Sequence, residues 1–216
     1  MLTDAIRPTS AAKTVFLDLP QASLHKVLRS LLRQWHFDLT ESSTKEGLHL
    51  TAPSPHQLTL HGPAGLLTSL PFPLRIEELW RAVEGPFYPF PRAHIRLNLE
   101  QALLLHLRGQ YEETSLSSLS DRGMRFFCKR ELVPEEELEV EMELEGEVLR
   151  LKGTVIYAQS RTDCWETGVV FQHITPAERL RVRNFIVRTL LTRARSEVGE
   201  DSFHEASGFF YLPAPG

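Results

Sequence analysis

The first half of the chain carries two helical patterns among short strand-like segments. Apolar residues recur at spacings of three and four over residues 23–35, which places them on one face of a helix. A second amphipathic helix is predicted to begin at Pro73 and to end near Gly85. Such faces need a partner to pack against, so residues 13–85 are predicted to form a small α/β domain behind a flexible leader at residues 1–12. The apolar face of the first helix consists of Leu24, Val27, Leu28, Leu31, Leu32 and Trp35.

From Leu97 onward the pattern becomes that of β-strands. The clearest strand is LEVEMEL, residues 138–144, in which Leu, Val, Met and Leu alternate with glutamates. This alternation indicates one buried face and one acidic, exposed face. Similar segments place six antiparallel strands within about 80 residues, which is typical of a small barrel. The fold class predicted for the whole chain is therefore α+β, mainly β, with the barrel in the C-terminal half.

A helix is predicted to follow the barrel. Thr175 has the character of an N-cap, and Glu178 completes a capping box with it. This helix is expected to continue to about Arg195. Residues 196–216 are predicted to be a flexible tail. The alternative for the aromatic cluster at residues 209–211 is that it docks on the body of the protein or on a partner.

The boundary between the two domains is predicted in a proline-rich segment. The stretch GPFYPFPR holds three prolines and a glycine, which exclude regular secondary structure. Residues 86–97 are therefore predicted to be a linker. The barrel with its helix is then expected to span residues 98–195.

Composition and charge narrow the functional classes. A net charge of −4 over 216 residues gives no overall attraction to nucleic acid or to an anionic membrane. The two cysteines, Cys128 and Cys164, form no disulfide framework, and no apolar run is long enough for a membrane helix or a signal peptide. The expectation is a cytoplasmic protein without membrane insertion. No P-loop, GxSxG, HExxH or zinc-ligand spacing is present, so no enzyme activity, catalytic residue, metal site or cofactor is predicted.

Two short motifs carry the candidate chemistry. RAHIR places Arg92 and Arg96 four residues apart in the linker, and SLSDRG places Ser118, Ser120 and Gly123 in a serine-rich turn between the second and third barrel strands. The planar guanidinium of arginine binds phosphate through two parallel hydrogen bonds, matches the O6 and N7 acceptors of guanine and stacks on a base. Small residues in a turn leave room for the edge of a base. The pair of motifs predicts a nucleotide site.

These motifs resemble those of the PilZ family, which has RxxxR before its barrel and [D/N]xSxxG after the second strand. A GVVF strand at residues 168–171 and an arginine-rich helix extend the likeness over about residues 90–195. The resemblance implies a cyclic di-GMP receptor in which these five motif residues bind the ligand, with an output in motility, adhesion or exopolysaccharide control. Ser118 stands where the family has Asp or Asn. Loss of one such contact costs about 1–3 kcal/mol, so weakened binding is expected.

The role of the N-terminal domain stays open at this stage. The order of its elements suggests a degenerate receiver-like domain or a divergent flagellar-brake-type domain, and an interaction or dimerisation module is the preferred interpretation. The leading hypothesis is a cyclic di-GMP effector whose ligand draws the linker onto the barrel, reorients the two domains and so signals to an unidentified protein partner. A homodimer is a further possibility. The alternative is a degenerate PilZ adaptor that binds a protein without binding the nucleotide.

Overall fold

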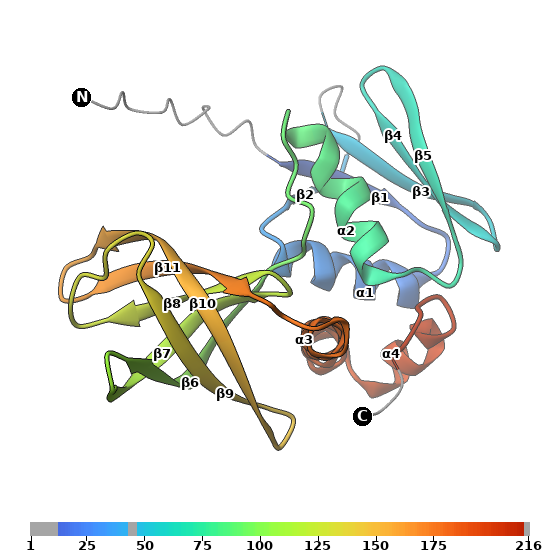
Figure 1. Ribbon diagram of the computed structural model, residues 1–216. Helices are drawn as coiled ribbons and strands as arrows, with labels where there is room; N and C mark the ends of the chain where they lie inside the picture. Colours follow the sequence, from blue (N-terminus) through green and yellow to red (C-terminus); the bar gives the residue numbers. More distant parts are fainter. Residues whose placement is uncertain (1–12, 43–46, 214–216) are drawn as a thin grey trace. The chain divides into compact units, whose positions relative to one another are not determined.

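The computed structural model describes residues 13–42 and 47–213 (Figure 1). The leader predicted at residues 1–12 lies outside this described part. The chain divides into two compact units. The N-terminal unit comprises Met1–Ala93 and Thr189–Gly216, and the barrel unit comprises His94–Arg188.

The N-terminal unit is built on a five-stranded mixed sheet with the strand order β2-β1-β3-β4-β5. Its first helix presents the predicted apolar face, and every residue of that face is buried. The second helix begins at Ile76, three residues after the predicted start at Pro73, and Gly85 caps its C-terminal end. The elements of this unit are β1 (Thr14–Asp18), α1 (Ala22–Gln34), β2 (Asp38–Thr40), β3 (Leu48–Ser54), β4 (Gln57–Gly62), β5 (Gly65–Pro71), α2 (Ile76–Glu84) and the 3₁₀ turn η1 (Gly85–Phe87).

The sheet topology shows that the receiver-like interpretation of this unit is wrong. Strand β1 is parallel to β2 and to β3, but β3, β4 and β5 are successive antiparallel neighbours. A receiver-like domain requires parallel strands joined by crossover helices. Here β3, β4 and β5 follow one another with only short turns between them, so no crossover helix covers that half of the sheet.

The segment predicted as a flexible tail is folded, so that prediction was wrong for most of its length. Helix α3 (Pro176–Val198) is followed by α4 (Glu200–Ser207). Beyond α4, the N–H of Leu74 donates to the carbonyl of Phe209 at 2.8 Å, and the N–H of Tyr211 donates to the carbonyl of Leu74 at 2.8 Å. Phe210 is buried, and the Phe209 ring meets Phe72 edge-on. Aromatic burial and paired backbone groups hold this segment in the N-terminal unit.

The barrel unit confirms the predicted six-stranded antiparallel barrel. Its strands close in the order β10-β11-β8-β7-β6-β9. Alternate residues point inward, and Leu105, Leu116 and Phe126 are among those with no exposed surface. The strands are β6 (Leu97–Leu107), β7 (Gln110–Ser120), β8 (Gly123–Cys128), β9 (Glu137–Leu144), β10 (Glu147–Ser160) and β11 (Trp165–Gln172).

The capping box at the start of α3 is also confirmed. One oxygen of the Glu178 carboxylate accepts hydrogen bonds from the backbone N–H of Thr175 at 2.8 Å and from its hydroxyl at 2.7 Å. The N–H of Glu178 donates back to the Thr175 hydroxyl at 3.2 Å. These bonds lower the pKa of Glu178. Among the described helices, α3 included, there is none with the length and apolar character needed to cross a membrane.

Candidate ligand-binding site

A pocket of about 230 Å³ opens on the outer surface of the barrel, beside β8, β10 and β11. It contains four of the five residues that the motifs single out, namely Arg96, Ser118, Ser120 and Gly123. The exposed side chains of Ile156, Tyr157 and Val170 form its apolar border. Arg122, Met124, Arg125, Gly168 and Val169 complete the lining.

The floor of this pocket is a row of residues from four strands, and Asn98 on β6 continues the row beyond the pocket. In the strand register, Tyr157 lies opposite Gly168, Gly168 opposite Arg125, Arg125 opposite Ser118, and Ser118 opposite Asn98. Directly opposed residues of antiparallel strands place their side chains on the same face, about 5 Å apart. Barrel closure therefore gathers on one surface residues that lie as far as 59 positions apart between Asn98 and Tyr157.

Two glycines allow this floor to be flat. A Cβ atom at Gly123 would lie 2.1 Å from the carbonyl oxygen of Val169, and one at Gly168 would lie 2.2 Å from a ring carbon of Tyr157. Only glycine permits β8 to approach β11 at the first position. At the second position, the missing side chain leaves space that the aromatic ring covers. Both glycines are thus required by packing within the barrel itself.

The two motif serines lie on a strand, which corrects the prediction of a serine-rich turn. Ser118 and Ser120 are the last residues of β7 on this face, and only Asp121 and Arg122 separate β7 from β8. Ser118 is 2% exposed. The Ser120 hydroxyl donates to the carbonyl of Gly123 at 3.0 Å and accepts from the N–H of Arg122 at 3.4 Å. Ser120 therefore stabilises the β7–β8 turn, and both serines line the pocket.

The charge of the pocket is positive. Arg96, Arg122 and Arg125 line it, and none of its lining residues is a carboxylate within the part of the chain that the structure describes. Three cations beside a small apolar border suit an anionic ligand with a flat apolar part. Arg92, the fifth motif residue, is exposed and belongs to the N-terminal unit, two residues before the barrel unit begins.

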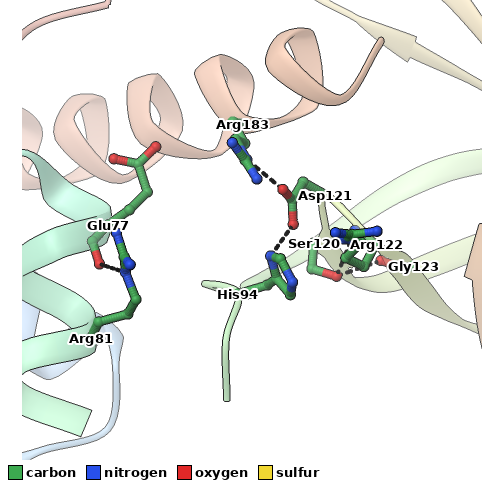
Figure 2. Close-up of polar contacts among 8 residues, drawn as sticks. All are labelled: Glu77, Arg81, His94, Ser120, Asp121, Arg122, Gly123 and Arg183. Carbon is green, nitrogen blue, oxygen red and sulfur yellow. Dashed lines mark hydrogen bonds and ion pairs between the residues drawn. The ribbon is translucent and has the colours of Figure 1, made fainter. Parts of the chain in front are cut away.

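A buried carboxylate holds the RAHIR segment against the barrel, and sequence reasoning missed it (Figure 2). Asp121 is 3% exposed, and one of its oxygens lies 2.8 Å from Nδ1 of His94. Its other oxygen accepts a hydrogen bond from Nε of Arg183 on α3. His94, which lies between the two motif arginines, is therefore the anchor of the segment that carries Arg96. No local pattern reveals this, because the three residues come from distant parts of the sequence.

Burial sets the protonation state of His94. Desolvation lowers its pKa, and the cations of Arg122, Arg183 and Arg179 add to this effect, while Asp121 opposes it. Nδ1 of His94 lies within hydrogen-bond distance of one Asp121 oxygen, and the other oxygen of Asp121 is paired with Arg183.

A larger cavity of about 780 Å³ lies elsewhere on the barrel unit and has the opposite charge. Five carboxylates and one lysine line it, together with apolar residues and the two thiols. It contains none of the motif residues, and its charge does not fit an anionic ligand. Among the described residues, no group of three or more His, Cys, Asp or Glu side chains is arranged to hold a metal ion.

The family model of the PilZ domain matches residues 90–188, which include the whole of the barrel unit. The chain therefore carries a PilZ domain in its C-terminal half. No curated protein matches the sequence.

Solved structures align with this chain at low sequence identity. The PilZ domain of YcgR from Escherichia coli with c-di-GMP aligns with a TM-score of 0.43 and 16% identity, covering 50% of this chain and 96% of that one. The inhibitor of motility MotI/DgrA of Bacillus subtilis aligns with a TM-score of 0.44 and 12% identity, covering 48% of this chain and 53% of that one. The K. pneumonia MrkH–c-di-GMP complex aligns with a TM-score of 0.44 and 12% identity, covering 50% of this chain and 55% of that one. The match thus spans about half the length of MotI/DgrA and of MrkH.

Substitution of Gly123 by alanine is expected to destabilise the barrel in the absence of any ligand. The new Cβ would meet a backbone oxygen, which cannot move aside as a flexible side chain does, so we expect a loss of about 2–3 kcal/mol in the free energy of unfolding. Urea unfolding of the variant and the wild type measures this loss in the free energy of unfolding. Gly208→Ala is the matched control, because nothing lies within 4 Å of a Cβ there. Equal stability of the two variants would contradict the close approach of β8 and β11.

Replacement of His94 by glutamine is expected to reduce the pH dependence of stability between pH 5 and about 6.5. A histidine whose pKa is lowered by folding binds more protons in the unfolded state, so stability falls as the pH decreases through the unfolded pKa. Glutamine keeps a donor for Asp121 but does not titrate. Melting temperatures across this range compare His94→Gln with the wild type. Parallel curves for the two proteins would show that His94 is not held neutral by its surroundings.

Proposed function

We propose that the protein is a cyclic di-GMP receptor that relays the level of this messenger to a protein partner. The observation that carries the proposal is the meeting of Arg96, Ser118, Ser120 and Gly123 in one cationic pocket within the PilZ domain. The two motifs are more than 20 residues apart in sequence. Their convergence on a surface lined by three arginines supports a shared ligand, and the PilZ family model supports cyclic di-GMP as that ligand.

The pocket offers complementary chemistry for both parts of such a ligand. Phosphodiester groups carry negative charge, and Arg96 and Arg122 supply charge-assisted donors for them. A guanine base has a flat face and an acceptor-rich edge. The half-exposed ring of Tyr157 offers a stacking surface, and the two glycines place no side chain on the pocket floor beside it. In this proposal the two serines shape the floor, while the arginines make the principal contacts.

The position of Arg92 suggests how binding is relayed. Arg92 belongs to the N-terminal unit and Arg96 to the barrel unit, with only three residues between them. A ligand that engages both side chains stabilises some relative orientations of the units over others. We propose that this reorientation changes the surface offered to a protein partner, with control of motility, adhesion or exopolysaccharide as the output.

The receptor function is tested by titration calorimetry of the full chain with cyclic di-GMP. We expect wild-type binding and a loss of about 10–100-fold on Arg96→Ala, because a hydrogen bond from a charged donor contributes about 1.5–3 kcal/mol. Arg150→Ala is the control, since Arg150 pairs with Glu141 on the barrel surface and does not line the pocket. If the wild-type protein gives no heat of binding with cyclic di-GMP, and a competition titration also detects no binding, the receptor proposal is refuted and a ligand-independent adaptor is favoured.

The relay is tested by small-angle X-ray scattering. Saturating cyclic di-GMP is expected to change the radius of gyration of the wild-type protein, and Arg92→Ala is expected to bind more weakly and to show a smaller change at saturation. The forward scattering gives the molecular mass, so dimer formation is separated from reorientation. Superimposable wild-type profiles with and without saturating ligand would show that binding does not reorient the units.

A further inference from the structure

Glu166 is a buried carboxylate that no motif includes. It lies on β11, is 6% exposed, and is paired with two arginines. Its Oε1 lies 2.9 Å from Nη1 of Arg125, and its Oε2 accepts from Nε of Arg161 at 3.0 Å and from the Nη2 of the same side chain. A buried carboxylate needs partners of this kind. In return, it fixes the orientation of both guanidinium groups.

Arg125 retains hydrogen-bonding capacity that the protein does not use. Its Nη2 reaches Asn98 only at 3.5 Å, and its Nε is buried without an acceptor in the part of the chain that the structure describes. A guanidinium has five N–H donors, so a single carboxylate contact leaves several of them available. The side chain is 32% exposed and lines the cationic pocket. An oriented guanidinium with unused donors at a pocket wall is prepared to meet acceptors on a ligand.

The place of Arg125 in the pocket floor indicates which acceptors it meets. It lies between Ser118 and Gly168 in the cross-strand row, and Tyr157 follows Gly168 in the same row. A base that stacks on the Tyr157 ring presents its edge along this row toward Arg125. Ser118 has only a short, buried hydroxyl here, so the longest polar side chain facing this edge is Arg125.

The charge balance favours a base over a phosphate as the group that Arg125 contacts. Glu166 pairs with Arg125 at 2.9 Å, so the positive charge that Arg125 offers a ligand is largely neutralised. A neutralised ion pair attracts an anion weakly but keeps directional donors. Guanine offers two acceptors, O6 and N7, on its Hoogsteen edge, and adenine replaces one of them by a donor.

We infer that Arg125 is a specificity-determining residue that reads the O6/N7 edge of a guanine base, and that Glu166 is the positioning residue that orients it. This inference rests on the proposed cyclic di-GMP receptor function and adds the selection of the base. Arg125 thereby supplies, from β8, the polar contact that the serine at position 118 is too short to make.

The test measures the affinities of the full chain for cyclic di-GMP and for cyclic di-AMP by calorimetry. We expect the wild type to prefer cyclic di-GMP. Arg125→Lys keeps the charge but loses the planar pair of donors, so it is expected to lower cyclic di-GMP affinity about 10–100-fold with little effect on cyclic di-AMP. Glu166→Gln frees the guanidinium and is expected to reduce the same preference by a smaller factor.

Arg150→Lys is the matched control, because Arg150 also forms a cross-strand ion pair at 2.9 Å but lies outside the pocket. Circular dichroism establishes whether each variant is folded. If Arg125→Lys is not folded, the test relies on Glu166→Gln. An unchanged preference in both variants, together with wild-type binding that Arg96→Ala weakens, overturns this inference and leaves the receptor function standing. A wild type that binds neither dinucleotide overturns both.

Discussion

The close approach of β8 to β11 is the constraint on which the site depends. Gly123 leaves no room for a Cβ beside the Val169 carbonyl, and Gly168 leaves none beneath the Tyr157 ring. A side chain at Gly123 would force β8 and β11 apart, and one at Gly168 would displace the Tyr157 ring of β10 that borders the pocket. The flat floor and the position of the aromatic border thus follow from close packing at these two glycines.

Two buried carboxylates hold basic side chains in place around the pocket. Asp121 is paired with His94 and Arg183, and Glu166 is paired with Arg125 and Arg161. Each carboxylate fastens separate segments together: the first joins the RAHIR segment to the β7–β8 turn and to α3, and the second joins β8 to the β10–β11 loop. Neither carboxylate is among the lining residues of the pocket, which include three arginines, while the chain as a whole carries a net charge of −4.

The sequence predicted the features whose causes are local or periodic. The apolar face of α1, the six strands of the barrel and the Thr175–Glu178 capping box each arise from residues close together in the chain, and all three are confirmed. The flexible tail and the receiver-like sheet were wrong. The first depends on pairing between Leu74 and Phe209, and the second on strand directions that alternation of polar and apolar residues does not encode.

The site shows the same division between local and long-range causes. Four of the motif residues meet in the pocket as their spacing suggested, because each motif flanks a barrel strand. The anchors His94 and Asp121 and the pair Arg125 and Glu166 could not be found in advance, since their partners lie between 27 and 62 positions away. Long-range ion pairs of this kind become visible only when the strand register is known.

The most direct test of the central claim is a titration of ¹⁵N-labelled full-length protein with cyclic di-GMP, followed by amide chemical shifts. The account predicts that the largest changes occur at residues 118–125, 156–157 and 168–170, which surround the cationic pocket. Changes centred instead on Cys128 and Met142, in the larger acidic cavity, would contradict it, as would an unchanged spectrum at saturating ligand.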